Sequence, residues 1–401
     1  MSLSVVMLSW EFPPRIVGGL AAHVHDLSIE LRKKGLEVHV VTLDFPGAPD
    51  REDVRGVKVY RVDSYKYAAP DFASWIAMMN VSLMNYASEN LKDSVNHPFI
   101  IHAHDWLVAH AAIALKHIFR MPLIVTMHST EYGRRGGIHD DYQRMIASIE
   151  AWLAREAWRV ITCSRYMADE VNRALATPLD KIDVIPNGVY LENFTSPVNP
   201  AELRSRFAAP HERLVLYVGR LVYEKGVHLL VEAIPQILQQ ADAKFVIVGE
   251  GYLKEWVRRR VYELGVADKT YVTGFLDIKT LRSLYSVADV FVMPSLYEPF
   301  GIVALEAASA GAPIVSTCAG GIAEILSHME TCVKVYPSPD SIAWGVLQVL
   351  HNRGLADYIR GNARARVENH YSWERIADRT IAVYEHVLRE YEAHPEWKPR
   401  R

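Results

Sequence analysis

The chain alternates short runs of β-branched and other apolar residues with longer amphipathic stretches along its whole length. This alternation is typical of parallel sheets whose strands are joined by crossover helices. The predicted strands are Ser4–Leu8, Val38–Leu43, Val57–Val62, Phe99–His104, Leu123–His128, Val160–Ser164, Ile182–Pro186, Leu214–Gly219, Phe245–Gly249, Tyr271–Gly274, Val290–Pro294, Pro313–Ser316 and Cys332–Tyr336. Since ligands bind at the carboxyl edge of such sheets, we expect an α/β protein with its site residues in the loops after the strands.

The length of 401 residues exceeds that of one typical hydrophobic core, so we expect two domains. The stretch 187–213 is rich in Asn, Pro and Ser and lacks apolar periodicity, which is typical of a connector. We therefore predict a first Rossmann-like domain at 1–195, a linker at 196–213 and a second Rossmann-like domain at 214–371. The remaining segment, 372–401, has a helical pattern.

Composition limits the partners and the compartment. Half of the residues are hydrophobic and 23% are charged, as in ordinary folded domains, and the net charge of −3 gives no field that would attract nucleic acid. Three widely spaced cysteines indicate a reducing compartment without a disulfide framework. No apolar run approaches the roughly 20 residues that span a bilayer, and the first residues lack the features of a signal peptide. We expect a cytoplasmic protein with no integral membrane segment; the sequence does not indicate an oligomeric state.

Two cations lie in the loop that opens the second half, in "GRLVYEKG" (219–226). Arg220 and Lys225 follow a predicted strand and precede a helix, where a forked guanidinium and a mobile ammonium suit a diphosphate. The alternative is a pair of solvated surface cations. The spacing matches neither a Walker A motif nor a dinucleotide fingerprint.

A second candidate is the stretch "SLYEPFGIVALEAASAGAPIV" (295–315). Pro299 ends the strand geometry, and Phe300-Gly301 opens a helix that runs to about Ala310. The first amides of a helix lack internal partners and carry partial positive charge, so a phosphate is favoured there.

Two carboxylates mark the ends of this stretch. Glu298 precedes the amides, and Glu306 lies five residues into the helix, roughly 7–8 Å along its axis at about 1.5 Å per residue. A nucleotide sugar laid along the helix would place sugar hydroxyls near Glu298, phosphates at the amides and ribose hydroxyls near Glu306. We prefer this interpretation to an acid/base pair or a pair of metal ligands, and a helix-capping role remains the alternative for Glu298.

Glycine pairs and histidines complete the set of candidates. Gly320-Gly321 and Gly18-Gly19 each precede a helix, where glycine allows close approach of the backbone to a ligand. His102 and His104 end one strand; we expect alternation to turn them to opposite faces, which argues against a metal site. His128 ends the next strand and could offer its ring or its carbonyl to a sugar.

Together these residues resemble those of retaining glycosyltransferases of the GT-B fold, in glycosyltransferase family 4. The matching residues are Gly219-Arg220, Glu224-Lys225-Gly226, Glu298, Glu306, Gly320-Gly321 with Glu324, Gly18-Gly19 and His128. The resemblance runs from the first loop to "YSWERIA" (371–377). It implies two Rossmann-like domains facing across a cleft, the first on the acceptor side and the second on the donor side, with 372–401 packing back on the first.

The resemblance also implies roles for individual residues. Arg220 and Lys225 would stabilise a departing diphosphate, and Glu298 would hold a hydroxyl of the donor sugar. The amides of Phe300, Gly301 and Ile302 would contribute to donor binding.

Further roles follow from the same resemblance. Glu306 would grip the ribose, His128 would belong to the catalytic group, and the two glycine pairs would line the donor site. The reaction would need no metal or other cofactor, only a nucleoside-diphosphate sugar as co-substrate. No nucleophile for a covalent intermediate stands out, which fits a front-face mechanism.

The substrates are suggested by local similarity. "SWEFPPRIVGGLAAHV" and "HAHDW" are similar to segments of glycogen and starch synthases, which favours glucose from ADP-glucose or UDP-glucose and a glucan or other glycoside as acceptor. One departure is Ile16, where bacterial glycogen synthases carry a lysine. The alternatives are a lipid- or small-molecule-directed glycosyltransferase, a hydrolase or epimerase that would use Glu131 or Asp105, and a non-enzymatic sugar-nucleotide binder.

Overall fold

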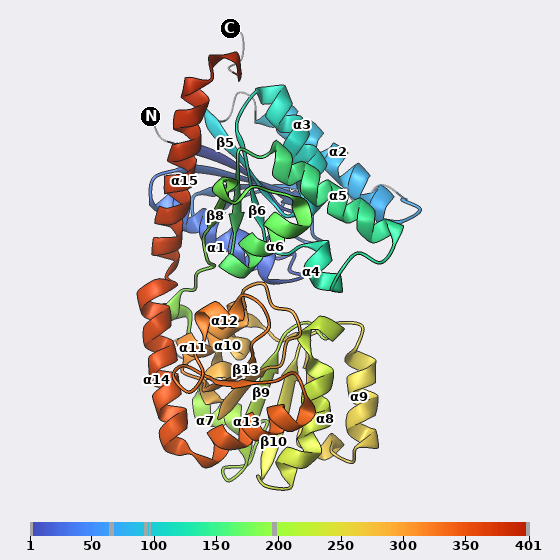
Figure 1. Cartoon of the computed structure of the whole chain (residues 1–401), viewed down its shortest axis with the longest axis vertical. Coiled ribbons are helices and arrows are strands. Elements are labelled where there is room, and N and C mark those ends of the chain that lie inside the picture. Colours follow the sequence, from blue (N-terminus) through green and yellow to red (C-terminus); the bar gives the residue numbers. More distant parts are fainter. Residues whose placement is uncertain (1–2, 64–67, 92–94, 96–97, 195–198, 398–401) are drawn as a thin grey trace. The chain divides into compact units, whose positions relative to one another are not determined.

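The computed structural model describes residues 3–63, 68–91, 95, 98–194 and 199–397. The chain divides into two compact units (Figure 1). The first unit comprises Met1–Asn187 and Trp373–Arg401, and the second comprises Gly188–Ser372.

The first unit contains an eight-stranded sheet with the order β3-β4-β2-β1-β5-β6-β7-β8. All neighbouring strands are parallel except β3 and β4. The strands are β1 (Ser4–Leu8), β2 (Glu37–Leu43), β3 (Arg51–Val54), β4 (Val57–Val62), β5 (Phe99–His104), β6 (Leu123–Met127), β7 (Arg159–Thr162) and β8 (Ile182–Val184). The central strands are buried along their whole length, as expected for a sheet that is covered on both faces.

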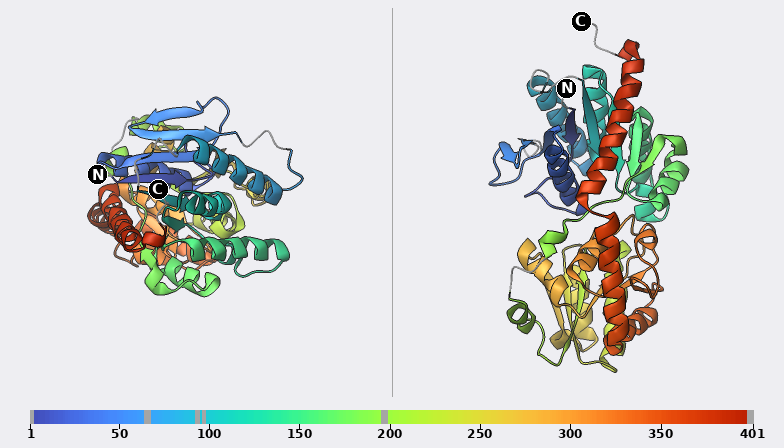
Figure 2. Two further views of the ribbon diagram at one scale, coloured as in Figure 1. Left: turned by 90° about the horizontal axis from the view of Figure 1, so that it is seen from above. Right: turned by 90° about the vertical axis from the view of Figure 1, so that its left-hand side faces the viewer.

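Seven α-helices are described in the first unit. They are α1 (Gly19–Lys33), α2 (Phe72–Asn90), α3 (Ala109–Phe119), α4 (Glu131–Arg135), α5 (Asp141–Glu156), α6 (Arg165–Leu175) and α15 (Trp373–Ala393). Figure 2 shows helices around this sheet from two further directions. The long helix α15 packs beside α1, with Trp373 buried and Lys34 paired to Asp378 at 2.7 Å.

The second unit contains a six-stranded, fully parallel sheet with the order β11-β10-β9-β12-β13-β14. Its strands are β9 (Arg213–Val218), β10 (Ala243–Val248), β11 (Thr270–Gly274), β12 (Val290–Met293), β13 (Ile314–Thr317) and β14 (Val333–Val335). Its helices are α7 (Pro200–Ser205), α8 (Val227–Leu238), α9 (Lys254–Glu263), α10 (Ile278–Val287), α11 (Ile302–Ala310), α12 (Ile322–Ile325), α13 (Pro339–His351) and α14 (Arg353–His370). The apolar core joins these strands to α8 and α13.

Each sheet has one point where the strand order reverses. In the first unit this point lies between β1 and β5, and in the second it lies between β9 and β12. The loops that follow the two strands diverge there to opposite faces of the sheet, which leaves room for a ligand at the carboxyl edge. We therefore expect ligands to bind at the loops after β1 and β5 in the first unit and at the loops after β9 and β12 in the second.

The predicted α/β class with two parallel sheets is confirmed. The sequence pattern missed β3, a short antiparallel edge strand with an exposed, charged sequence. It pairs with β4 through a two-residue turn at Arg55 and Gly56, both with positive φ, and the Asp53 carboxylate accepts the Gly56 amide at 2.6 Å. A charged edge strand carries no apolar alternation, so periodicity could not reveal it.

The division into units differs from the predicted linker at 196–213. Residues 188–194 of the predicted first domain belong to the second unit, and the predicted boundary between 195 and 196 lies outside the described residues. The part of the linker from 199 onward belongs to the second unit, because Leu203 is buried and Arg204 donates to Asp289 at 2.7 Å. The apolar pattern of the sequence does not reveal this, because the segment is polar and is attached to the unit through one buried leucine and one arginine.

Among the described residues, no helix combines the length and the apolar character that crossing a membrane requires.

Candidate functional site

The loop after β9 is held against the loop after β12 by a close backbone contact at Gly226. This glycine has φ of +68°, and a Cβ there would lie 1.9 Å from the carbonyl oxygen of Pro294. The amides of Leu296 and Tyr297 donate to the Glu224 carbonyl at 2.8 and 3.2 Å. The "EKG" turn therefore needs glycine at this position, and it places Lys225 beside the segment that carries Glu298.

Lys225 and Glu298 form an ion pair across these two loops. The Lys225 ammonium donates to Glu298 Oε2 at 2.7 Å, and the two side chains are 19% and 10% exposed. Ser295 donates to the same carboxylate oxygen at 3.3 Å. The two residues are 73 positions apart in the chain, so the pair exists only because β9 and β12 are neighbours.

Arg220 lies at the start of the same loop, just after β9, but is held more loosely than Lys225. Its side chain is 45% exposed, and its guanidinium contacts Glu224 at 3.2 Å, four residues along. An exposed pair of this kind contributes little stability. The Arg220 carbonyl accepts from the buried Tyr217 hydroxyl at 3.0 Å, which fixes the backbone while the guanidinium extends into solvent.

The helix that follows β12 begins without a side-chain cap. Gly301 precedes α11 with φ of +102° and, as a glycine, supplies no side-chain cap to the first turn. A Cβ at Gly301 would approach the Ile322 side chain to 2.8 Å, so space and backbone angle both favour glycine. Phe300 is buried with its ring against Tyr371, and Ile302 is the first helical residue. The uncapped amides of this turn can bind an anion.

Glu306 lies within α11 and is oriented by a residue that the sequence did not single out. The buried Tyr285 hydroxyl donates to Glu306 Oε2 at 2.9 Å. Burial, and then the nearby carboxylate, raise the pKa of Tyr285, so the hydroxyl remains a donor at neutral pH. Tyr285 lies in α10, and its ring packs against Phe291 of β12.

The second glycine pair is joined to the Glu298 segment. Gly320 has φ of +75°, and the Gly321 amide donates to the Glu298 carbonyl at 2.9 Å. The structure thus brings Lys225, Glu298 and the glycine pair together at one edge of the second sheet. Glu306 lies farther along α11.

In the first unit, the glycine pair before α1 meets a carboxylate of the protein itself. Glu11, which is buried, accepts from the amides of Val17 and Gly18 at 2.7 and 2.9 Å. Burial raises the pKa of Glu11, and the two amides oppose that rise. Gly18 is extended, with φ of −157°, and Gly19 is the first residue of α1. The Gly18 amide is therefore already engaged.

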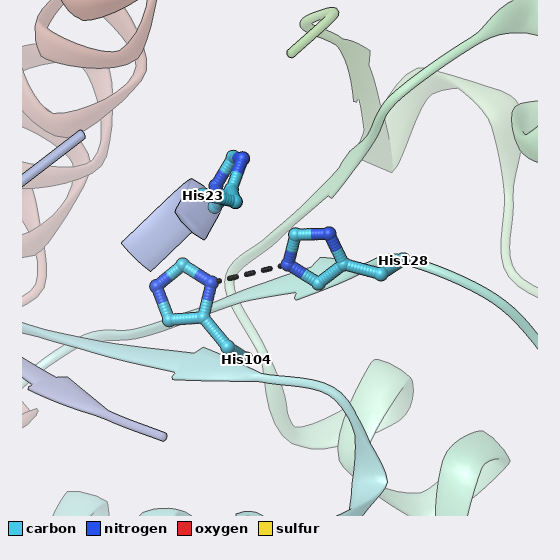
Figure 3. Close-up of side chains that lie close together, drawn as sticks. All are labelled: His23, His104 and His128. Carbon is cyan, nitrogen blue, oxygen red and sulfur yellow. Dashed lines mark hydrogen bonds between the residues drawn. The ribbon is translucent and has the colours of Figure 1, made fainter. Parts of the chain in front are cut away.

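His128 belongs to a cluster of histidines at the carboxyl edge of the first sheet (Figure 3). His104 Nδ1 lies 3.3 Å from His128 Nε2, and the His23 ring from α1 packs edge-on against His128 with ring centroids 4.5 Å apart. In the β5–β6 register, His104 pairs with Thr126, which brings His128 beside it.

The prediction that His102 and His104 point to opposite faces is wrong. Side chains two residues apart on a strand share a face, and these two rings lie with centroids 4.3 Å apart. Both ring nitrogens of His102 have partners, namely the hydroxyls of Tyr384 and Thr126, each at 2.7 Å. His102 is therefore a satisfied core residue, whereas His104 faces His128.

These imidazoles are neutral at neutral pH. Burial lowers the pKa of His128 to about 4 and lowers the pKa of His23, His102 and His104 well below the usual value, with neighbouring imidazoles adding to the effect on the last three. The cluster offers uncharged ring nitrogens, not positive charge.

Asp105 and Glu131 each hold the segment around His128. Asp105, whose pKa burial raises to about 6, accepts the His128 amide at 2.7 Å. The Glu131 carboxylate accepts from Arg134 at 2.8 Å, and the backbone amide of Glu131 donates to the Glu150 carboxylate. Both carboxylates thus stabilise this loop, which argues against the hydrolase or epimerase roles considered from sequence.

Three participants were not predicted: His23, Glu11 and Tyr285. His23 lies four residues after Gly19 in "GGLAAHVH", and a polar residue on the buried face of an amphipathic helix was the available indication. Nothing in the sequence linked Tyr285 to Glu306 or Glu11 to the glycine pair, because those contacts join different elements.

Comparison with known proteins identifies the family. The family model described as "Glycosyltransferase Family 4" matches residues 17–193, and the one described as "Glycosyl transferases group 1" matches residues 200–366. An uncharacterized glycosyltransferase from Methanocaldococcus jannaschii is 41% identical over 95% of this chain and 98% of its own. The chain belongs to the family 4 glycosyltransferases.

Further similarities agree with this membership. A glycogen synthase from Mycobacterium tuberculosis is 36% identical to this glycosyltransferase over 95% of the chain and 94% of its own. Among solved structures, sucrose-phosphate synthase from Thermosynechococcus elongatus matches with a TM-score of 0.83 at 24% identity, covering 97% of this chain and 100% of that one.

The catalytic domain of starch synthase IV from Arabidopsis thaliana, solved with ADP and acarbose, matches with a TM-score of 0.76 at 18% identity. It covers 98% of this chain and 99% of that one. These structures support the GT-B fold, and the protein is an enzyme that transfers sugars.

Proposed function

We propose that this enzyme transfers a hexose, most simply glucose, from ADP-glucose or UDP-glucose to a hydroxyl of a glucan or other glycoside, with retention at the anomeric carbon. The observation that carries the proposal is the pairing of Lys225 with Glu298 beside the uncapped start of α11, at the point where the second sheet reverses its strand order. A lysine ammonium, helix amides and an oriented carboxylate together suit a sugar diphosphate.

The positive charge for the leaving group comes from the protein. Lys225 is paired with Glu298, which precedes α11, and Arg220 is paired with Glu224 in its own loop with 45% of its side chain exposed. These groups can neutralise a diphosphate as it departs without a metal ion. Glu298 would then accept from a sugar hydroxyl, while Lys225 donates to both the carboxylate and a phosphate oxygen.

Glu306 would bind the ribose. The Tyr285 hydroxyl donates to one oxygen of its carboxylate and so orients the group that would accept from the diol. Gly320 and Gly321 would complete the donor site by allowing the ligand to approach the backbone. From the first unit, Gly18, Gly19 and His128 would contribute to the donor and sugar binding that the family resemblance implies.

In the transfer step, the acceptor oxygen forms a bond to the anomeric carbon as the bond from that carbon to the diphosphate oxygen breaks. The proton of the acceptor hydroxyl passes to the departing diphosphate on the same face. Asp105 and Glu131 are committed to the His128 loop, so neither is placed as a nucleophile or base by its contacts. This arrangement supports a front-face reaction.

The test is to incubate the enzyme with several nucleoside-diphosphate sugars, with and without glucan, and to follow nucleoside diphosphate release. We expect release that depends on acceptor, with an α-linked product by NMR when the donor is α-linked. Equal release without acceptor would indicate hydrolysis, and thermal stabilisation without turnover would indicate a binding protein; either result contradicts the proposal.

A further inference from the structure

The histidine cluster of the first unit has a feature that sugar binding by His128 alone does not explain. One ring nitrogen from each of His23, His104 and His128 lies within 4.8 Å of the other two, and His23 and His104 are buried. The three side chains come from α1, from the end of β5 and from the loop after β6, and Figure 3 shows their rings gathered around one point.

The ring of His23 is oriented as a metal ligand is oriented. Its Nδ1 lies 2.6 Å from the Asn187 side-chain oxygen, which makes Nδ1 the donor and leaves a lone pair on Nε2. That Nε2 is buried and has no hydrogen-bond partner among the described residues. Leaving a buried polar atom unpaired costs free energy, so a ligand for this nitrogen would be stabilising.

The distance between the other two histidines fits the same interpretation. His104 Nδ1 and His128 Nε2 are 3.3 Å apart, a long separation for a hydrogen bond between two neutral rings. In a tetrahedral zinc site with Zn–N bonds of about 2.0–2.1 Å, neighbouring ligand nitrogens are separated by about 3.4 Å. The observed separation therefore matches one edge of such a site, and a modest movement of His23 would complete the triangle.

We infer that His23, His104 and His128 form a binding site for a single Zn²⁺ ion. Three neutral imidazoles with a fourth position for water or a hydroxyl are a ligand set that zinc accepts. The site would inhibit transfer, because a metal ion on His128 removes that ring from sugar binding. The inhibitory part rests on the proposed function, whereas the binding itself does not.

The test begins with tag-free enzyme, ZnCl₂ and isothermal titration calorimetry. We expect one ion per chain, with the affinity lowered at least about 100-fold in both His23→Gln and His104→Gln and about 10- to 100-fold in Asn187→Ala. The matched control is His25→Gln, since His25 lies two residues from His23 on α1 but is partly exposed and paired with Asp26; it should bind as the unchanged protein does.

Two further readouts keep the inference testable if a variant fails to fold. Co²⁺ bound to the unchanged enzyme should give the intense visible absorption of a tetrahedral site, and Zn²⁺ should displace it. Zn²⁺ should also lower transfer activity, and EDTA should restore it. Absence of stoichiometric binding, an octahedral Co²⁺ spectrum, or affinity unaffected by the His23 and His104 substitutions would overturn the site. Tight binding without inhibition would overturn only its link to transfer.

Discussion

The two strand-order reversals of this enzyme have the same topology but opposite chemistry. In the second unit, the loop after β9 carries two cations and the helix after β12 starts without a cap. In the first unit, the carboxylate of Glu11 already accepts the Val17 and Gly18 amides ahead of α1, and the adjacent histidines are neutral. The capacity to bind an anion therefore lies mainly in the second unit, and the first offers neutral groups that suit hydroxyls.

The largest expected effect comes from removing the cations of the second unit. Lys225→Ala should lower kcat by about 10²- to 10³-fold, and addition of Arg220→Ala should lower it further, because the charge of the departing diphosphate is left unpaired. Steady-state kinetics with the best donor measures both changes.

The control for the cation variants is Lys269→Ala, which removes a lysine paired to Glu212 and Asp242 elsewhere in the same unit and should leave kcat near that of the unchanged enzyme. If the Arg220/Lys225 double variant kept its activity, the cations at the second unit's strand-order reversal would not be needed to bind the diphosphate, and the contrast with the first unit would be wrong.

Substitution of glycine by alanine should change the free energy of unfolding by different amounts at the two strand-order reversals. Gly226→Ala should destabilise the second unit by at least about 3 kcal/mol, because the new Cβ collides with the Pro294 carbonyl and φ is positive. Gly18→Ala should change stability by no more than about 0.5 kcal/mol, since φ is extended and a Cβ would meet nothing within 4 Å. Denaturant unfolding measures both, and equal effects would contradict the geometry at Gly226.

The pH dependence of stability should be centred on the first unit. His23, His102, His104 and His128 have lowered pKa values, to about 4 for His128, so the folded state binds fewer protons than the unfolded state below the usual value of 6.5. The stability of this unit should fall as the pH drops through 6.5 toward 4.

Three buried carboxyls oppose this trend in the same unit. The pKa of Asp105 is raised to about 6, that of Glu150 to about 7, and burial also raises the pKa of Glu11, so each of them adds stability as the pH falls through its raised value. Four imidazoles should outweigh these three groups. Hydrogen exchange at pH 7 and pH 5 would show the change, and greater protection of the β5–β6 region at pH 5 would contradict the assignment.

The smallest expected effect concerns the ribose end of the donor site. Glu306→Ala should raise the KM for the donor about 10-fold with little change in kcat, since the residue would bind a part of the donor remote from the reacting bond. Tyr285→Phe should have a weaker effect of the same kind, because it only releases the carboxylate that the hydroxyl orients. A large fall in kcat with unchanged KM would place Glu306 at the reaction centre.

How far the sequence predicts this molecule depends on whether a feature is local. The strand pattern gave the two parallel sheets, and the glycines and proline around α11 gave its start near Gly301 and its end at Gly311. The pairs Lys225–Glu298 and Tyr285–Glu306 could not be predicted, because they arise from strand order and from helix packing. Period-two alternation alone is sufficient to predict that the side chains of His102 and His104 lie on the same face of their strand.

The most direct test of the account is a crystal structure of the enzyme with UDP-glucose or ADP-glucose. We expect the diphosphate oxygens within hydrogen-bond distance of the amides at Phe300–Ile302, with Lys225 and Arg220 turned toward them. A diphosphate bound elsewhere, or bound with both cations still paired only to Glu298 and Glu224, would contradict the central claim that the second unit's strand-order reversal is the donor site.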